Sequence, residues 1–168
     1  MLNSIIPSSK FKPLTSIQLK QFLTTDPYFI GVYPRDLLPK TIHHHHRSQP
    51  FTLIVNTDTS NLAGQHWVAV FVDDHSHGEY FDSLAQPIPQ HIALWLSRFS
   101  TQWKYVLRPF IDPPIQNVFS QTCGAFTFYF VHRRPLLDSS RQVLTPFYGK
   151  TLTVNDHYVV SYLLLNKK

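Results

Sequence analysis

Cysteine is nearly absent from this chain of 168 residues, in which Cys123 stands alone. One cysteine cannot form an internal disulfide, and it cannot build a four-cysteine zinc site. A chain of this size buries roughly two-thirds of the surface that its unfolded form exposes, so it needs no such staples to fold. With 43% hydrophobic and 14% aromatic residues, the composition excludes disorder as the default state. It favours a globular protein with intracellular chemistry and a free thiol.

Long apolar runs are missing as well. No stretch approaches the roughly 18 to 20 residues that span a bilayer. The first seven residues lack the basic region, apolar block and small-residue cleavage site of a signal peptide. Repeats and low-complexity linkers are also missing. At about 150 residues per domain, we expect residues 1–168 to form a single domain with its core at about 15–165, and we expect the protein not to be secreted.

Charged side chains are few, and 15 Lys and Arg against 10 Asp and Glu leave a net charge of +5. The basic residues form no long run, so they act either as ordinary solvated charge or as a footprint for the phosphate backbone of a nucleic acid. The histidine run His43-His44-His45-His46 lies in a proline-rich stretch typical of a surface loop. Adjacent histidines in a loop indicate adventitious metal binding at most, so no functional metal site is expected.

Short strands and helices alternate along the chain. Continuous apolar and β-branched runs predict strands, and capped or proline-opened amphipathic segments predict helices. A polar turn at 73–78 predicts that two of the strands form an antiparallel hairpin. The expected strands are 51–55, 67–72, 79–82 and 103–107, and the expected helices begin at Thr15, at Pro87 and Pro89, at Cys123 and at Asn155.

The apolar run that follows Cys123 fits either a strand or a buried helix. We favour a central helix that ends at Arg133-Arg134-Pro135, because basic residues suit the carbonyl end of a helix and proline stops it. A cysteine at the first turn of such a helix lies at the positive end of its dipole, which stabilises a thiolate. Cys123 is therefore a candidate nucleophile, although free cysteines are commonly buried and inert.

Three further side chains could complete a nucleophilic site. A cysteine nucleophile needs an imidazole to take its proton and an acceptor to orient that imidazole. His66 and Asp82 stand at the outer ends of the predicted hairpin, where antiparallel pairing would bring them together. Gln116, seven residues before Cys123, could donate to an oxyanion together with the Cys123 backbone amide. Taken singly, these residues also fit a half-buried histidine, a capping carboxylate and a loop-surface glutamine.

This order of residues resembles the clan of cysteine proteases that includes the adenovirus maturation endopeptidase (adenain) and the SUMO-deconjugating proteases. The resemblance covers roughly residues 15–135, and Gly124 allows close backbone approach beside the nucleophile. Its N-terminal part, with 27–33 and 54–57, is more similar to adenain, whereas 81–84 is more similar to the SUMO proteases. The matching segments are His66-Trp67, Tyr80-Phe81-Asp82-Ser83-Leu84, Gln116 and Cys123-Gly124.

The resemblance implies an α+β, papain-like or adenain-like fold in which a central helix carries the cysteine and packs on a mainly antiparallel sheet. It implies a Cys123, His66 and Asp82 mechanism with Gln116 as the oxyanion donor, and no metal. Trp67 and Gly124 would line a narrow tunnel for glycine, although Trp67 also fits an ordinary core tryptophan. Asp82 stands where adenain has glutamate, a change already found in the SUMO-protease branch.

Adenain is activated by a peptide bound through a second cysteine, which this chain lacks. Covalent activation is therefore not expected, but the resemblance allows DNA and a noncovalent activating peptide as cofactors. We expect a monomeric cysteine endopeptidase that cleaves after glycine in precursor proteins of a virus or a Polinton-type element, in the host nucleus and the virion. The alternatives are a ubiquitin-like-modifier deconjugase and a non-catalytic basic DNA-binding or packaging protein.

Overall fold

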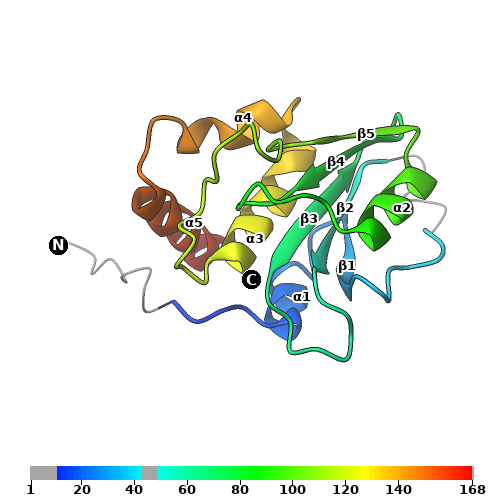
Figure 1. Ribbon diagram of the computed structural model, residues 1–168, viewed down its shortest axis with the longest axis horizontal. Coiled ribbons are helices and arrows are strands. Elements are labelled where there is room, and N and C mark those ends of the chain that lie inside the picture. The colour runs from blue at the N-terminus through cyan, green and yellow to red at the C-terminus, as the bar shows by residue number, and fades with distance from the viewer. Residues whose placement is uncertain (1–10, 43–48, 168) are drawn as a thin grey trace.

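The computed structural model describes residues 11–42 and 49–167. Met1–Pro7 and the histidine run 43–46, on which two of the predictions rest, lie outside these residues. The elements in chain order are α1 (Ser16–Phe22), β1 (Phe29–Pro34), β2 (Phe51–Asn56), β3 (Trp67–Val72), β4 (His77–Phe81), α2 (Gln90–Phe99), β5 (Gln102–Tyr105), α3 (Cys123–Arg133), η3 (Arg134–Leu136), α4 (Ser140–Leu144), η4 (Thr145–Phe147) and α5 (Leu152–Asn166) (Figure 1).

The five strands form one sheet in the order β1-β2-β3-β4-β5. The predicted hairpin is confirmed, because β3 and β4 pair antiparallel with Ala69 opposite Phe81 and Val72 opposite Gly78. β2 and β3 are also antiparallel, whereas β1 and β5 pair in parallel with their neighbours. Long connections precede β2 and β5, and such connections are what parallel pairs require. The predicted α+β fold class is confirmed, with a sheet that is antiparallel at its centre and parallel at both edges.

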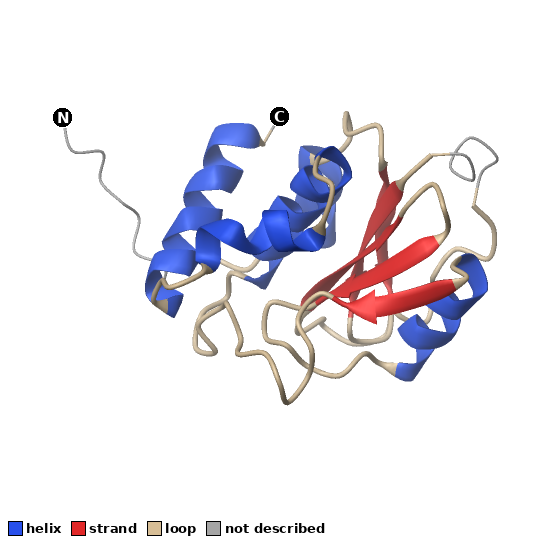
Figure 2. Cartoon of the chain, turned by 90° about the horizontal axis from the view of Figure 1, so that it is seen from above, coloured by secondary structure: helices blue, strands red, loops and turns tan. Residues whose placement is uncertain are grey.

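Helices cover both faces of the sheet. Figure 2 shows most of the helices on one side and a single helix, α2, on the other. Because side chains alternate along a strand, one set packs in the core with α3 and the other packs in the core with α2. The first set includes Ile54, Ala69, Phe71 and Phe81, and the second includes Leu53, Val55, Val68, Val70 and Tyr80. Burial on both faces explains why these strands are apolar throughout. The single domain expected for 1–168 stays a prediction.

The helix that begins at Cys123 is buried over its first nine residues, which confirms the interpretation of this apolar run as a helix. It packs between the sheet and α5, and the ring of Phe130 stacks on Phe81 with their centres 4.5 Å apart. α3 ends at Arg133, as predicted, and the chain continues into a short 3-10 helix that contains Pro135. This packing fixes the end of the helix that carries the thiol.

At the far end of α3, Arg134 forms a buried ion pair with Glu79 of β4. Its Nε and Nη2 donate to the two carboxylate oxygens at 2.6 and 3.2 Å, and its guanidinium lies 4.1 Å from the centre of the Phe71 ring. Lys104 of β5 approaches the same carboxylate at 3.3 Å, but its side chain is exposed. The pair ties the carboxyl end of α3 to the strand that leads to Asp82.

Some local predictions were wrong. Pro89 is the N-cap of α2 and lies before the helix, and β5 ends at Tyr105. Neither β1 nor α4 was expected. Asn155 is not a cap: Thr151 caps α5, and Asn155 is buried inside it, where its side chain donates to the Ile115 carbonyl. Asparagine is common at caps because its side chain bonds to nearby backbone, and here it bonds to backbone forty residues away.

Candidate active site

His66 and Asp82 meet at the end of the β3–β4 hairpin. His66 directly precedes β3 and Asp82 directly follows β4, so the antiparallel register carries both to one edge of the sheet. Nε2 of His66 lies 2.7 Å from Oδ1 of Asp82, and the same oxygen accepts the Leu84 backbone amide at 2.8 Å. The carboxylate is therefore held by its own turn while it orients the imidazole.

Cys123 lies beside the same imidazole, at the first turn of α3. Burial lowers the pKa of His66, but hydrogen bonds to Asp82 and Cys123 and the charges of both groups outweigh it and raise the pKa to about 10. Since Nε2 faces Asp82, Nδ1 is the nitrogen left for the sulfur. An imidazolium at neutral pH is thus placed between the Asp82 carboxylate and the Cys123 sulfur.

Gln116 is buried in the loop between β5 and α3. Its Oε1 accepts the Ser83 hydroxyl at 2.6 Å, and its Nε2 donates to the Ser120 carbonyl at 3.2 Å. A carboxamide has a second N–H donor on the same nitrogen. The structure thus links Gln116 to Ser83, the neighbour of Asp82, and to the loop that ends at Cys123. His66 contacts Asp82 directly, and Cys123 lies close enough to raise the pKa of His66.

Trp67 and Gly124 pack against the N-terminal segment of the chain. Nε1 of Trp67 donates to the Leu14 carbonyl at 2.8 Å. A Cβ on Gly124 would lie 3.0 Å from Leu14 Cβ and 3.3 Å from Trp67 Cδ1, which is tighter than ordinary contact. Gly124 therefore allows Leu14 and Trp67 to approach the start of α3 closely, and its part in binding a substrate stays a prediction.

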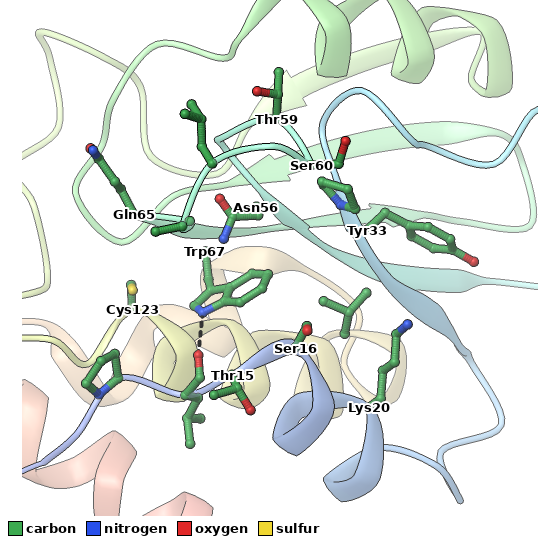
Figure 3. A pocket seen from close by; sticks show the side chains of 17 residues that line it. Thr15, Ser16, Lys20, Tyr33, Asn56, Thr59, Ser60, Gln65, Trp67 and Cys123 are labelled. Carbon is green, nitrogen blue, oxygen red and sulfur yellow. Dashed lines mark hydrogen bonds between the residues drawn. The ribbon is translucent and has the colours of Figure 1, made fainter.

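A cavity of about 460 Å³ opens next to Cys123. Figure 3 shows Trp67 between Cys123 and Lys20, with Thr15 and Ser16 along one wall and Asn56, Thr59 and Ser60 along another. These residues come from the start of α1, the end of β2 and the connection between β2 and β3. The cavity has the size of a ligand pocket, and both Trp67 and the thiol line it.

Four residues that shape this site, Leu14, Ser83, Asn155 and Asp156, were not predicted to take part in it. Leu14 was unmarked because a lone leucine has no distinctive pattern. Ser83, Asn155 and Asp156 form hydrogen bonds with the loop that contains Gln116 and leads to Cys123. A buried polar residue within the apolar face of a helix is the signal that would have found Asn155 and Asp156, because such a residue requires a hydrogen-bond partner.

The described ranges contain neither a group of metal-ligating side chains nor a membrane-spanning helix. Among residues 11–42 and 49–167, no three His, Cys, Asp or Glu side chains are grouped so as to hold a metal ion. Within the same ranges no helix is both long enough and apolar enough to cross a membrane.

A helix that presents a cysteine to a histidine and a carboxylate on a sheet is the arrangement of the papain-like cysteine-protease fold. No family model matches the chain. In structure, it aligns with the African swine fever virus pS273R protease at a TM-score of 0.63, covering 97% of this chain and 70% of that one at 18% identity. The selenomethionine form of that protease gives a TM-score of 0.64, covering 94% of this chain and 70% of that one at 16% identity. This likeness supports the fold.

In sequence, the chain is similar to the SUMO-1 cysteine protease S273R of the African swine fever virus isolate Tick/South Africa/Pretoriuskop Pr4/1996, at 32% identity over 91 residues. The Cysteine protease S273R of strain Badajoz 1971 Vero-adapted gives the same values. The match covers 50% of this chain and spans about a third of the length of these relatives. The predicted likeness to the SUMO-protease branch is supported, and the closer likeness to adenain stays a prediction.

Proposed function

We propose that this protein is a cysteine peptidase with Cys123 as nucleophile, His66 as base and acid, and Asp82 as the residue that orients His66. The observation that carries the proposal is the position of the His66 ring, 2.7 Å from Asp82 and close enough to Cys123 for the thiol to help raise the pKa of the imidazole. The relatives named cysteine protease support the same chemistry. A cysteine that is only structural has no need of an imidazole held by a buried carboxylate.

The reaction proceeds in two steps. Sγ of Cys123 attacks the scissile carbonyl carbon, and the pair of electrons moves to the carbonyl oxygen. The Gln116 amide and the Cys123 backbone N–H stabilise that oxyanion. When the C–N bond breaks, the His66 imidazolium protonates the departing amine and leaves a thioester. Water, deprotonated by His66, then attacks the thioester, and its cleavage releases the carboxylic acid and regenerates the thiolate.

The substrate class we propose is a polypeptide with glycine at the scissile bond. Trp67 lines the cavity beside Cys123, and Gly124 packs closely against Trp67 and Leu14. The resemblance, in which a tryptophan beside the nucleophile lines a narrow tunnel, supports glycine as the residue at the scissile bond. Precursor proteins of a virus or mobile element are the substrates that the resemblance to viral proteases suggests.

A second candidate keeps the chemistry and changes the substrate to a ubiquitin-like modifier. The name of one similar protein, SUMO-1 cysteine protease, favours it. Such modifiers end in an extended tail, which the same cavity beside Cys123 would accept. A modifier probe with a reactive C-terminal glycine that labels Cys123 faster than a short glycine peptide is cleaved would favour this candidate.

Cofactors and location are part of the proposal. The net charge of +5 supports stimulation by DNA through its phosphates, and a noncovalent peptide activator fits a chain that has one cysteine. A reducing compartment keeps a free thiol reduced, so we propose an intracellular site of action, including the host nucleus and virion. We propose a monomer. Stimulation of cleavage by DNA that disappears at high salt would support binding of the DNA phosphates by the positive charge of the protein.

The decisive experiment is digestion of a glycine-containing peptide library, with and without DNA, with cut bonds assigned by mass spectrometry. Cys123→Ala should abolish cleavage, and His75→Ala, which alters an exposed histidine, should cleave like the unmodified protein. Full cleavage by Cys123→Ala would reject the peptidase. No cleavage by any variant, together with tight salt-dependent DNA binding, would favour a basic packaging protein instead.

A further inference from the structure

Two adjacent polar residues of α5 are buried against the loop that leads to Cys123. Asn155 is 2% exposed and Asp156 is fully buried, on the helix face that also carries Val159, Val160 and Leu163. Burying a carboxylate among apolar side chains is costly unless hydrogen bonds compensate. Burial also raises the pKa of Asp156. The partners of these two side chains show what the burial achieves.

Asn155 and Asp156 hold the residues on either side of Gln116. Nδ2 of Asn155 donates to the Ile115 carbonyl at 2.9 Å, and Oδ1 of Asp156 accepts the Asn117 amide at 3.3 Å. From the opposite direction, the Ser83 carbonyl accepts the amides of Ile115 and Gln116 at 2.9 and 3.2 Å. The backbone of Gln116 is thus fixed between α5 and the turn that follows Asp82.

Asp156 also holds the residue before the nucleophile. Its Oδ1 accepts the Thr122 hydroxyl at 3.1 Å, and the Thr122 carbonyl accepts the first backbone bonds of α3, from Ala125 and Phe126. The Thr122 and Ser120 hydroxyls are 2.8 Å apart, and the Ser120 carbonyl accepts the Gln116 side chain. One carboxylate therefore connects both proposed oxyanion donors, the Gln116 amide and the Cys123 backbone N–H.

We propose that Asn155 and Asp156 are positioning residues that set the Gln116 amide and the Cys123 backbone amide at the distance an oxyanion requires. The inference rests on the proposed peptidase function. Donors that stabilise an oxyanion act through preorganised geometry, and loss of one costs about 10²–10³ in rate. Misplacement by about 1 Å costs of the order of 10². Neither α5 residue touches the reacting atoms.

The test compares Asp156→Ala, which removes the acceptor, with Asp156→Asn, which keeps an oxygen for Asn117 and Thr122. Asp156→Ala should lower kcat about tenfold to hundredfold with KM little changed, and Asp156→Asn should restore most of the rate. A peptide aldehyde forms a hemithioacetal whose oxygen takes the oxyanion position, so its affinity should fall by the same factor as kcat. The rate of Cys123 alkylation by iodoacetamide, which needs no oxyanion donor, should stay unchanged.

Thr122→Val is the second variant, because it removes a single hydroxyl and keeps the shape of the side chain. It should lower kcat in the same direction even where Asp156→Ala does not fold. Asp74→Ala, which removes an exposed carboxylate, is the matched control and should keep the original kcat. Unchanged kcat and aldehyde affinity in Thr122→Val, and in Asp156→Ala when it folds, would overturn the positioning role. So would equal losses of kcat and of alkylation rate.

These outcomes separate the inference from the function on which it rests. A protein that cleaves peptides, loses cleavage with Cys123→Ala and keeps full kcat with every folded Asp156 and Thr122 variant contradicts only the positioning role. A protein whose cleavage survives Cys123→Ala contradicts the peptidase assignment itself.

Discussion

His66 and Asp82 are sixteen residues apart in the chain, and their side chains are 2.7 Å apart in the structure. The carboxylate does not depend on the histidine for its position, because the Leu84 amide binds the same oxygen. The imidazole is aimed by a group that is already fixed. A change at His66 should therefore leave Asp82 in place, whereas a change at Asp82 should also affect the orientation of His66.

Asp82→Asn should lower kcat by about a hundredfold or more, since an amide oxygen orients the imidazole but does not stabilise an imidazolium as a carboxylate does. The Leu84 amide keeps its acceptor, so the fold should persist. The pKa of His66 should also fall, because Asp82 provides the largest of the contributions that raise it. Peptide cleavage followed as a function of pH measures both effects. An unaltered upper limb of that profile would contradict the role of Asp82.

Stability should depend on pH through His66. Its pKa is raised from 6.5 to about 10 in the folded protein, so the folded state holds this proton more tightly than the unfolded state. The contribution is fully present below pH 6.5 and is lost progressively as the pH rises to about 10. Urea unfolding at a series of pH values should show this decline, and His66→Gln should flatten it. His75→Ala should leave the decline in place.

Glu79→Gln should destabilise the protein by about 3–5 kcal/mol, because it leaves the buried Arg134 guanidinium without its counter-charge. Lys104→Met removes the other cation near Glu79, but that side chain is exposed, so its effect should stay within about 1 kcal/mol. Urea unfolding monitored by circular dichroism gives both values. Equal effects of the two substitutions would show that burial of the Arg134 pair contributes nothing special.

Gly124→Ala should reduce cleavage more than it changes stability. A methyl group improves helix propensity by about 1 kcal/mol, which offsets part of the cost of crowding Leu14 and Trp67. The displaced Leu14 and Trp67 lie on the cavity beside Cys123. Gly149→Ala is the contrast: nothing surrounds that position, but its φ of +69° favours glycine. It should lose stability and keep activity, as thermal melts and peptide assays can establish.

The parts of the fold that depend on local pattern could be predicted. The capping box of Thr15 and Gln18 places α1, the 73–78 turn places the hairpin, and Arg134 with Pro135 marks the end of α3. β1 was not predicted as a strand, because it is only partly buried and pairs in parallel across a long connection. β1 is a strand because it pairs with β2, and its own residues carry no pattern that predicts this pairing.

The candidate site could be predicted as far as the hairpin brings distant residues together. His66 and Asp82 follow from antiparallel register, and the position of Cys123 at the first turn of a helix follows from the apolar run after it. The bonds from α5 to Ile115 and Asn117 could not be predicted, because they join segments about forty residues apart. Asn155 was interpreted as a cap for the same reason: local bonding preferences say nothing about a partner elsewhere in the fold.

The Glu79 and Arg134 pair has a consequence for how the molecule tolerates change. β4 carries Glu79 three residues before Asp82, and α3, an eleven-residue helix of about 16 Å, carries Cys123 at the end opposite Arg134. The ion pair holds β4 and α3 together at the carboxyl end of α3, and the proposed catalytic residues Asp82 and Cys123 lie at the other ends of these two elements. Replacing Glu79 or Arg134 alone would allow Asp82 and Cys123 to move relative to each other. Related sequences should therefore change both positions together or neither.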